Sequence, residues 1–296
     1  MNEVKPKNQP FMNQRIILFI LLIFCLAEVK SQNNDTQAGL YNILSGSLIG
    51  GVGAMINKKP NEKTGKVFLK GLGQGALGGY MTFESKRLIR DFSDTGNYAY
   101  VWPSRLLNSL GNSIILNASS NRKFWERYYL NIGFSHFEYD IKRENSFQVK
   151  LLPFSLLSTF YGFSQGEIDF RRSFYTGNLF FESYKNTENY NGKAILNVVI
   201  LNKGLLDNRS NTIGHELIHT FQYEGFIGFN SYLDKKMNNI KREGDFWTKF
   251  NFILYPDWNA LIFSSAYNIS APFANSYENR FYEKEAYYYT GSLLNE

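Results

Sequence analysis

The sequence predicts an α+β protein in which a glycine-rich helical hairpin precedes a larger domain of strands and helices. Two apolar segments, residues 40–57 and 66–83, carry small residues at helical spacing and predict the hairpin. Residues 126–203 contain aromatic and β-branched runs separated by polar or glycine breaks, a pattern typical of strands. We expect these runs to form a mixed or antiparallel sheet. Residues 211–224 again have apolar side chains at helical spacing, so a helix should follow the sheet.

The composition limits the class of protein. The chain has 296 residues, and a hydrophobic share of 44% excludes a largely disordered protein. One Cys excludes a disulfide scaffold or a cysteine-ligated metal cluster, and there are only three His. The formal net charge is +6, which falls to about +4 without residues 1–31. Because Lys and Arg form no dense stripe, nucleic acid is not an expected partner.

The N-terminus has the pattern of a secretory signal peptide, residues 1–31. A basic segment precedes the apolar run 16–27, and we expect cleavage after Ser31. The protein would then be exported to the periplasm, associated with the outer membrane, or secreted. A membrane anchor is the alternative, but a span needs about 20 apolar residues. Lipidation at Cys25 is disfavoured, because Phe24 stands where such cleavage sites need a small residue.

The predicted hairpin, residues 32–93, allows helix backbones to approach each other closely. The small residues are glycines four positions apart, such as Gly46/Gly50 and Gly71/Gly75. The apolar character of the hairpin also indicates contact with a membrane surface through residues 40–92, and Lys70 could snorkel there. Packing onto the following domain is the preferred interpretation of the hairpin, and membrane contact is the alternative. Residues 73–78 match GxGxxG, but no strand–turn–helix unit surrounds them, so nucleotide binding is not expected.

The domain after the hairpin, residues 94–296, begins with a predicted helix over residues 98–122, where Leu and Ile recur near a spacing of 3.6. The strand-like runs that follow are residues 128–141, 146–154, 178–184 and 194–202.

The helix predicted over residues 211–224 carries a pattern with chemical meaning. His215 and His219 are four residues apart, and Glu216 follows the first, which gives HExxH. On a helix the two imidazoles lie about 40° apart on one face, so they can hold one zinc ion. Glu216 lies about 60° from His219, beside the metal, where it can take a proton from a zinc-activated water. A helix with two structural histidines is the alternative.

A catalytic zinc site needs a third protein ligand and an open position. His136 is the one remaining histidine, and a lone histidine in a strand is more often structural. Glu224 lies about 180° around the helix from His215 and points away. A carboxylate in residues 277–289 is therefore the best candidate.

That segment offers Glu283 and Glu285, which lie about 200° apart on a helix, so one alone can face the metal. Glu283 shares its side with Ala286, whose small side chain lets two helices pack closely. Glu283 is the preferred ligand, and Glu285 is the alternative.

The HExxH helix and this segment resemble the zincin metallopeptidases. Residues 215–222 are similar to the HExxHxxQ form of the motif, and residues 283–286 to the Glu-x-x-Ala segment of gluzincin-like enzymes, including minimal exported ones. The resemblance implies a zincin-like catalytic domain that binds one Zn²⁺ through His215, His219 and Glu283. It also implies that Glu216 acts as general base and that a peptide or protein is the substrate. The strand region and the glycine-rich hairpin also resemble uncharacterised exported bacterial proteins, a resemblance that implies no mechanism.

One position departs from the family pattern. Thermolysin-like enzymes place an Asp four residues after the ligand Glu, where it binds a ligand His, and this chain has Tyr287 there. A phenol orients an imidazole less firmly than a carboxylate does. Tyr287 and Tyr282 are candidates for stabilising the transition state, and Gln222 shares the histidine side of its helix. The alternative function is an envelope-associated binding or structural protein with a vestigial or structural zinc site.

Overall fold

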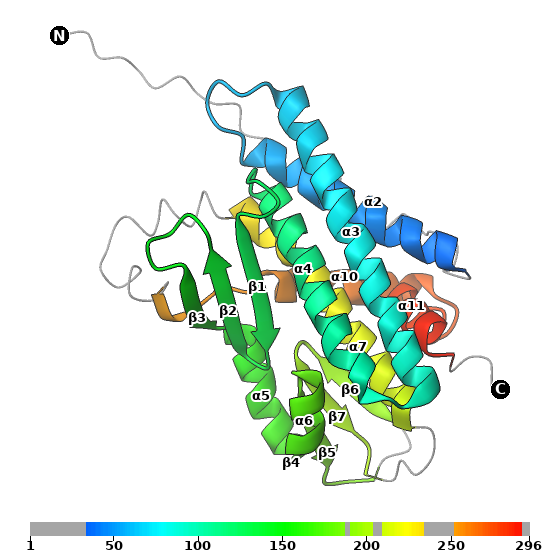
Figure 1. Cartoon of the computed structure of the whole chain (residues 1–296). Helices are drawn as coiled ribbons and strands as arrows, with labels where there is room; N and C mark the ends of the chain where they lie inside the picture. The colour runs from blue at the N-terminus through cyan, green and yellow to red at the C-terminus, as the bar shows by residue number, and fades with distance from the viewer. Residues whose placement is uncertain (1–33, 187–189, 204–208, 234–251, 292–296) are drawn as a thin grey trace.

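The computed structural model describes residues 34–186, 190–203, 209–233 and 252–291 (Figure 1). The predicted signal peptide lies outside the described residues, as does part of the aromatic segment between the HExxH helix and Glu283. Long helices dominate the described chain, and two small sheets complete it. The predicted α+β class is therefore confirmed.

Two long helices form the predicted hairpin. Helix α2 (Asp35–Ile56) begins after Asn34, whose side chain accepts a hydrogen bond from the backbone N–H of Gln37. Helix α3 (Thr64–Thr95) ends at Gly96, which has a φ of 68°, and a glycine adopts this left-handed conformation without strain. The helices extend beyond the predicted apolar segments, and the predicted boundary after residue 93 falls inside α3.

Glycines allow α2 and α3 to pack backbone against backbone. A Cβ atom built on Gly75 would lie 2.1 Å from the Gly46 carbonyl oxygen, and one on Gly50 would lie 2.6 Å from that of Gly71. The close approach expected from the glycine spacing is confirmed. Residues 73–78 lie inside α3, so they form no loop between a strand and a helix that could cradle a phosphate.

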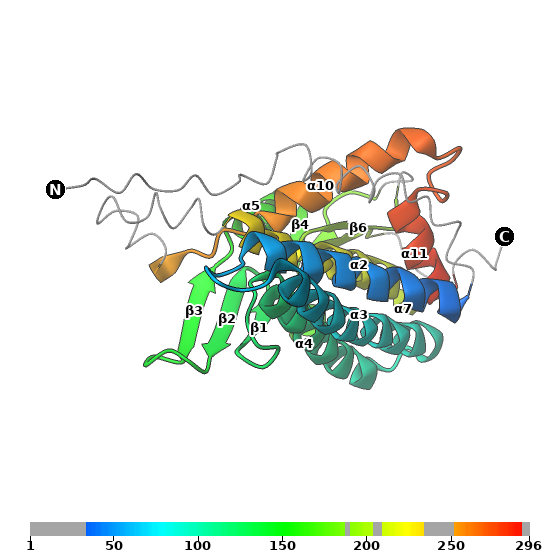
Figure 2. The same cartoon turned by 90° about the horizontal axis from the view of Figure 1, so that it is seen from above.

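Helix α4 (Val101–Ser119) packs against both helices of the hairpin (Figure 2). A short 3-10 turn, Tyr98–Tyr100, precedes it, so the helix predicted over 98–122 is confirmed with a slightly earlier end. The close contact again depends on glycine, because a Cβ on Gly78 would lie 2.5 Å from the Gly111 carbonyl oxygen.

The first sheet is antiparallel, with the strand order β1-β2-β3. Its strands are β1 (Arg127–Ile132), β2 (Ser135–Asp140) and β3 (Phe147–Leu151). The predicted run 128–141 thus folds back on itself, with a turn at Gly133, whose φ is 53°.

The second sheet is mixed, with the order β4-β5-β7-β6, and its one parallel pair is β5 with β7. Its strands are β4 (Gly166–Ile168), β5 (Leu179–Ser183), β6 (Gly192–Ile195) and β7 (Val198–Leu201). Two helices that the sequence analysis does not predict, α5 (Pro153–Gln165) and α6 (Phe170–Thr176), interrupt the strand region.

The strand-like run predicted over residues 194–202 is confirmed as strand, but it is divided between the end of β6 and the whole of β7. The chain reverses at Leu196 and Asn197, and Ile195 pairs with Val198 across the turn. Leu196 has a φ of 55°, which is uncommon for a residue other than glycine. The run contains no Gly or Pro that would mark the turn, so the pattern of β-branched residues reads as continuous.

The C-terminal part is helical. It contains α7 (Arg209–Gly225), α10 (Asn259–Ser270) and α11 (Phe281–Thr290), with 3-10 turns at Ile227–Phe229 and Ala271–Phe273. Helix α7 lies between the second sheet and the α3 helix of the hairpin.

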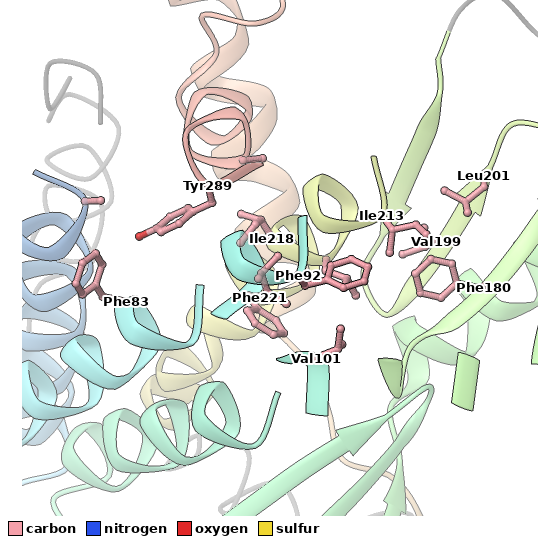
Figure 3. Packing of buried hydrophobic residues seen from close by; sticks show 14 residues of the cluster. Phe83, Phe92, Val101, Phe180, Val199, Leu201, Ile213, Ile218, Phe221 and Tyr289 are labelled. Carbon is pink, nitrogen blue, oxygen red and sulfur yellow. The ribbon is translucent and has the colours of Figure 1, made fainter. Parts of the chain in front are cut away.

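One hydrophobic cluster joins the hairpin, the second sheet and helices α7 and α11 (Figure 3). Phe83 and Phe92 of α3 share it with Val199 of β7, Leu217 of α7 and Tyr289 of α11. The hairpin therefore contributes to the same core that holds the HExxH helix in place.

Helix α2 is the one described helix that is long and apolar enough to cross a membrane by length and composition. Half of its most apolar window is buried against the rest of the protein. Core helices of soluble proteins and signal sequences near an N-terminus can have the same length and apolar composition. Its outer face still exposes Leu40, Leu44 and Leu48 at a spacing of one helical turn.

Candidate metal centre

Helix α7 has one face in the core and another at an open cleft. Ile213, Leu217 and Thr220 are buried, as predicted for the face opposite His215. Gly214 lets α7 approach α3, because a Cβ at this position would lie 2.0 Å from the Ser93 hydroxyl oxygen. This contact places α7 directly against α3, and the side chains of the HExxH motif point away from the core.

Three ligand atoms converge between α7 and α11. The Nε2 atoms of His215 and His219 are 3.1 Å apart, and they lie 3.1 Å and 3.3 Å from Glu283 Oε2. Ligand atoms about 3.3–3.6 Å apart are expected around a tetrahedral ion with bonds of 2.0–2.2 Å. The preferred residue Glu283, and not the alternative Glu285, completes a group that can hold a metal ion.

The packing of α11 explains why Glu283 faces the histidines. Ala286, one turn further along, is completely buried in the core shared with α7, so the two helices lie close together. Glu285 points to the other side of α11, where it accepts a 2.6 Å hydrogen bond from Lys86.

The second oxygen of Glu283 is held by two phenols. Tyr267 and Tyr277 donate hydrogen bonds of 2.5 Å and 2.7 Å to Oε1, which leaves Oε2 directed at the histidines. Burial by itself would raise the pKa of Glu283, but its bonds to His215 and His219 hold that pKa well below its usual range. Burial and the Glu283 charge raise the pKa of Tyr267 to about 12, so its hydroxyl stays a donor.

His219 is oriented through its other ring nitrogen. Its Nδ1 lies 2.8 Å from Gln222 Oε1, so Gln222 takes the supporting position that the sequence suggested for it. Burial lowers the pKa of His219, but the hydrogen bond and charge of Glu283 outweigh this effect and raise the pKa to about 9.

The outward nitrogen of His215 has a different environment. Among the described residues, its buried Nδ1 has no hydrogen-bond partner. Tyr287, which occupies the position of the family's Asp, places its ring 4.5 Å from the His215 ring in a tilted contact. On this side of the ring, His215 is packed against Tyr287, whereas its Nε2 faces the Glu283 carboxylate.

Glu216 lies against strand β6. Its carboxylate accepts a hydrogen bond from the backbone of Ala194, and a Cβ on Gly192 would lie 2.8 Å from Glu216 Oε1. The absence of a side chain at position 192 therefore makes room for this carboxylate. Burial raises the pKa of Glu216, although the neighbouring His215 and His219 act in the opposite direction.

The triad and Glu216 stand in the wall of a large cleft, with a volume of about 1310 Å³. Strand β6 forms one side, and residues of α5 and α10 form much of the rest. The lining is rich in apolar and aromatic side chains, among them Leu157, Tyr161, Leu261 and Tyr277. Within the described residues β6 is the last strand of its sheet, so its outer edge faces the cleft, where Ala194 already donates to Glu216.

Neither a scan against protein-family models nor searches of curated proteins and solved structures gave a match. A function for this chain therefore has to be inferred from the chemistry of the cleft.

Of the other residues considered from the sequence, Tyr282 lies away from its predicted place, whereas His136 lies in a strand as expected. Tyr282, a candidate for transition-state stabilisation, is packed in the apolar cluster of Phe226 and Phe229 instead of in the cleft. His136 lies in the first sheet, stacked between Tyr129 and Tyr255.

The sequence analysis missed Tyr267, Tyr277 and Lys86. No spacing or composition marks them, because each approaches the centre from a different element.

Proposed function

We propose that this protein is an exported zinc-dependent metallopeptidase of the zincin type. The observation that carries the proposal is the convergence of His215, His219 and Glu283 in an open cleft, with Glu216 next to them. Two imidazoles and one carboxylate are a donor set found in catalytic zinc sites, which keep one position open.

The nature of the donors favours zinc. Imidazole nitrogens suit zinc and other transition metals, whereas Ca²⁺ and Mg²⁺ prefer sites built of oxygen ligands. Only one of the three ligand atoms, Glu283 Oε2, is an oxygen. A zinc ion bound here would act as a Lewis acid and activate a water molecule.

Glu216 supplies the proton transfer. Its buried carboxylate, with a raised pKa, can take a proton from the attacking water and return it to the leaving amine. The water oxygen bonds to the carbonyl carbon and the C–N bond breaks, so an acid and an amine result. The bond from Ala194 and the contact with Gly192 hold Glu216 in position for both steps.

The cleft suits an extended polypeptide. An edge strand can bind a peptide by adding it as a further strand, and β6 offers such an edge beside Glu216. Across the cleft, Leu157 and Leu261 are largely exposed and would accept apolar side chains of that peptide. A peptide bond lying along β6 would therefore reach the metal centre.

The experiment measures zinc content and hydrolysis of an unstructured protein such as casein. We expect one zinc per chain in the wild type, and hydrolysis that falls by about 10³-fold or more in Glu216→Gln, because the general base is lost. Zinc content should be unchanged in this variant. Glu167→Gln is the matched control, because it removes a charge at an exposed position of strand β4. It should leave zinc content and hydrolysis unchanged.

Two results contradict the proposal. Protein without stoichiometric zinc, or equal hydrolysis by wild type and Glu216→Gln, excludes this mechanism. Tightly bound zinc without any hydrolysis would favour a structural zinc site.

A further inference from the structure

We propose that Glu285, paired with Lys86, is a positioning residue for the metal ligand His219 and acts through the amide of Gln222. The proposal rests on the metal site proposed above. It concerns the orientation of that site, which neither the HExxH motif nor Glu283 determines.

The amide of Gln222 has its orientation fixed by its two acceptors. Its Nε2 donates to the Tyr282 carbonyl oxygen at 2.8 Å and to Glu285 Oε2 at 2.9 Å. An amide nitrogen has two hydrogens, so both are used. The amide oxygen of Gln222 must therefore face His219.

This orientation selects the tautomer of His219. The Gln222 oxygen is an acceptor only, so the His219 Nδ1 atom at 2.8 Å has to carry a hydrogen and donate it. In the neutral ring, Nε2 then has a free lone pair. Nε2 is the atom that faces His215 and Glu283, so the lone pair points to the place of the metal.

The ion pair holds the other end of this chain of bonds. Lys86 donates to Glu285 Oε1 at 2.6 Å and to Asn42 at 2.9 Å, and the side chains of Lys86 and Glu285 are 4% and 0% exposed. With Oε1 occupied in this way, Oε2 remains the acceptor for Gln222. A protonated or amide group at position 285 could instead donate to Gln222 and favour the reversed amide.

The buried ion pair of Arg105 and Glu224 allows a direct comparison, because Glu224 lies on α7, the helix that also carries Gln222. Glu224 of α7 is also fully buried and lies 3.5 Å from the buried Arg105, but its other bonds go to Asn108 and Asn131. Both pairs are buried in the core, and of the two the Lys86–Glu285 pair alone continues to a metal ligand through Gln222. The two can therefore be separated by a measurement on the metal.

The test measures zinc affinity by competition with a chromophoric chelator, together with the absorption spectrum of the cobalt(II) form. We expect zinc affinity to fall about 10–100-fold in Gln222→Met, and about tenfold in Glu285→Gln, with a changed cobalt(II) spectrum in both. Glu224→Gln should lower the melting temperature but leave zinc affinity within about twofold and the spectrum unchanged.

A double variant separates stability from orientation. Lys86→Met combined with Glu285→Gln removes both buried charges, so the melting temperature should recover relative to Glu285→Gln alone. Zinc affinity should stay low, because the amide of Gln222 is still not fixed.

The possible results separate this proposal from the peptidase proposal. Unchanged zinc affinity in Glu285→Gln, or affinity that recovers together with stability in the double variant, would show that the pair is structural and would overturn the inference. Wild type that binds zinc without hydrolysing peptides would contradict the peptidase proposal and leave the affinity comparison valid. Wild type that binds no zinc would overturn both.

Discussion

Glu283 uses its two carboxylate oxygens for different purposes. Oε2 approaches the two histidines, while Oε1 accepts hydrogen bonds from Tyr267 and Tyr277. A carboxylate held in this way can offer a metal one oxygen and not two. The hydroxyl groups thereby determine how many positions around an ion stay open for water and substrate.

This arrangement predicts the effect of removing one hydroxyl. Tyr267→Phe should weaken zinc binding by roughly tenfold, because Glu283 Oε1 loses a donor and the carboxylate gains freedom to rotate. Since Tyr277 donates to the same oxygen and can partly replace Tyr267, the variant with both Tyr267→Phe and Tyr277→Phe should lose more affinity than the two single effects add up to. Zinc titration of the metal-free protein measures both effects.

Tyr161→Phe serves as the control, because Tyr161 lines the same cleft on α5 and interacts with Lys193. Equal zinc affinity in wild type and Tyr267→Phe would show that the phenols do not orient Glu283.

For single residues, the sequence predicts the relative positions of side chains that lie on one helix. His215, Glu216 and His219 lie within about one turn of α7, so spacing alone brings them together. The third ligand could be narrowed to Glu283 and Glu285, and the small Ala286 on the side of Glu283 favoured Glu283. Tyr267 and Lys86 could not be found, since their places depend on how α10 and α3 pack in the folded chain.

At the scale of elements, the hairpin depends on glycines that are not equivalent. In α3, a Cβ on Gly75 would collide with the Gly46 backbone, whereas a Cβ on Gly73 would meet nothing within 4 Å. Both glycines belong to the same helical interior. The first is required by packing, and the second only weakens the helix.

We therefore expect opposite effects of the same substitution. Gly75→Ala should lower the free energy of unfolding by about 2 kcal/mol or more, because the helices must separate. Gly73→Ala should raise it by about 0.5–1 kcal/mol, since alanine favours the helix. Chemical denaturation measures both changes, and a destabilising Gly73→Ala would show that position 73 is also packed.

The elements differ in how well their sequence predicts them. The hairpin helices carry long apolar runs with regular glycine spacing, and both are confirmed. The turn at Leu196 and Asn197 was not predicted, because leucine rarely adopts a positive φ and the run contains many β-branched residues and no Gly or Pro. This turn bears on the proposed peptide binding, because it leads the chain from β6, the edge strand beside Glu216, into β7.

For the molecule as a whole, acid stability should depend on the first sheet. Glu138 of β2 is buried, 2.9 Å from Arg143 and 3.1 Å from Arg127. Burial would raise its pKa, but His136 and Arg127 outweigh this and lower the pKa to about 2. A lowered pKa in the folded state stabilises the fold above the unfolded-state value near 4.5, and this contribution is lost as the pH falls through about 2.

Glu138→Gln should therefore reduce the free energy of unfolding by roughly 2–3 kcal/mol at pH 7, and by progressively less between pH 4.5 and pH 2. Denaturation curves at a series of pH values measure this difference. Glu144→Gln, at an exposed position in the loop between β2 and β3, should leave the curves unchanged. A pH-independent effect of Glu138→Gln would show that its charge is unimportant.

The pair of Lys86 and Glu285 joins positions 199 residues apart, and Asn42 meets Glu285 across 243 residues. Contacts with such large sequence separation form late, because long loops must close first. A chain still being synthesised has α7 and its two histidines before it has α11. The proposed peptidase would thus acquire its third ligand and the support for His219 only at the end of folding, and would be inert towards its neighbours until then.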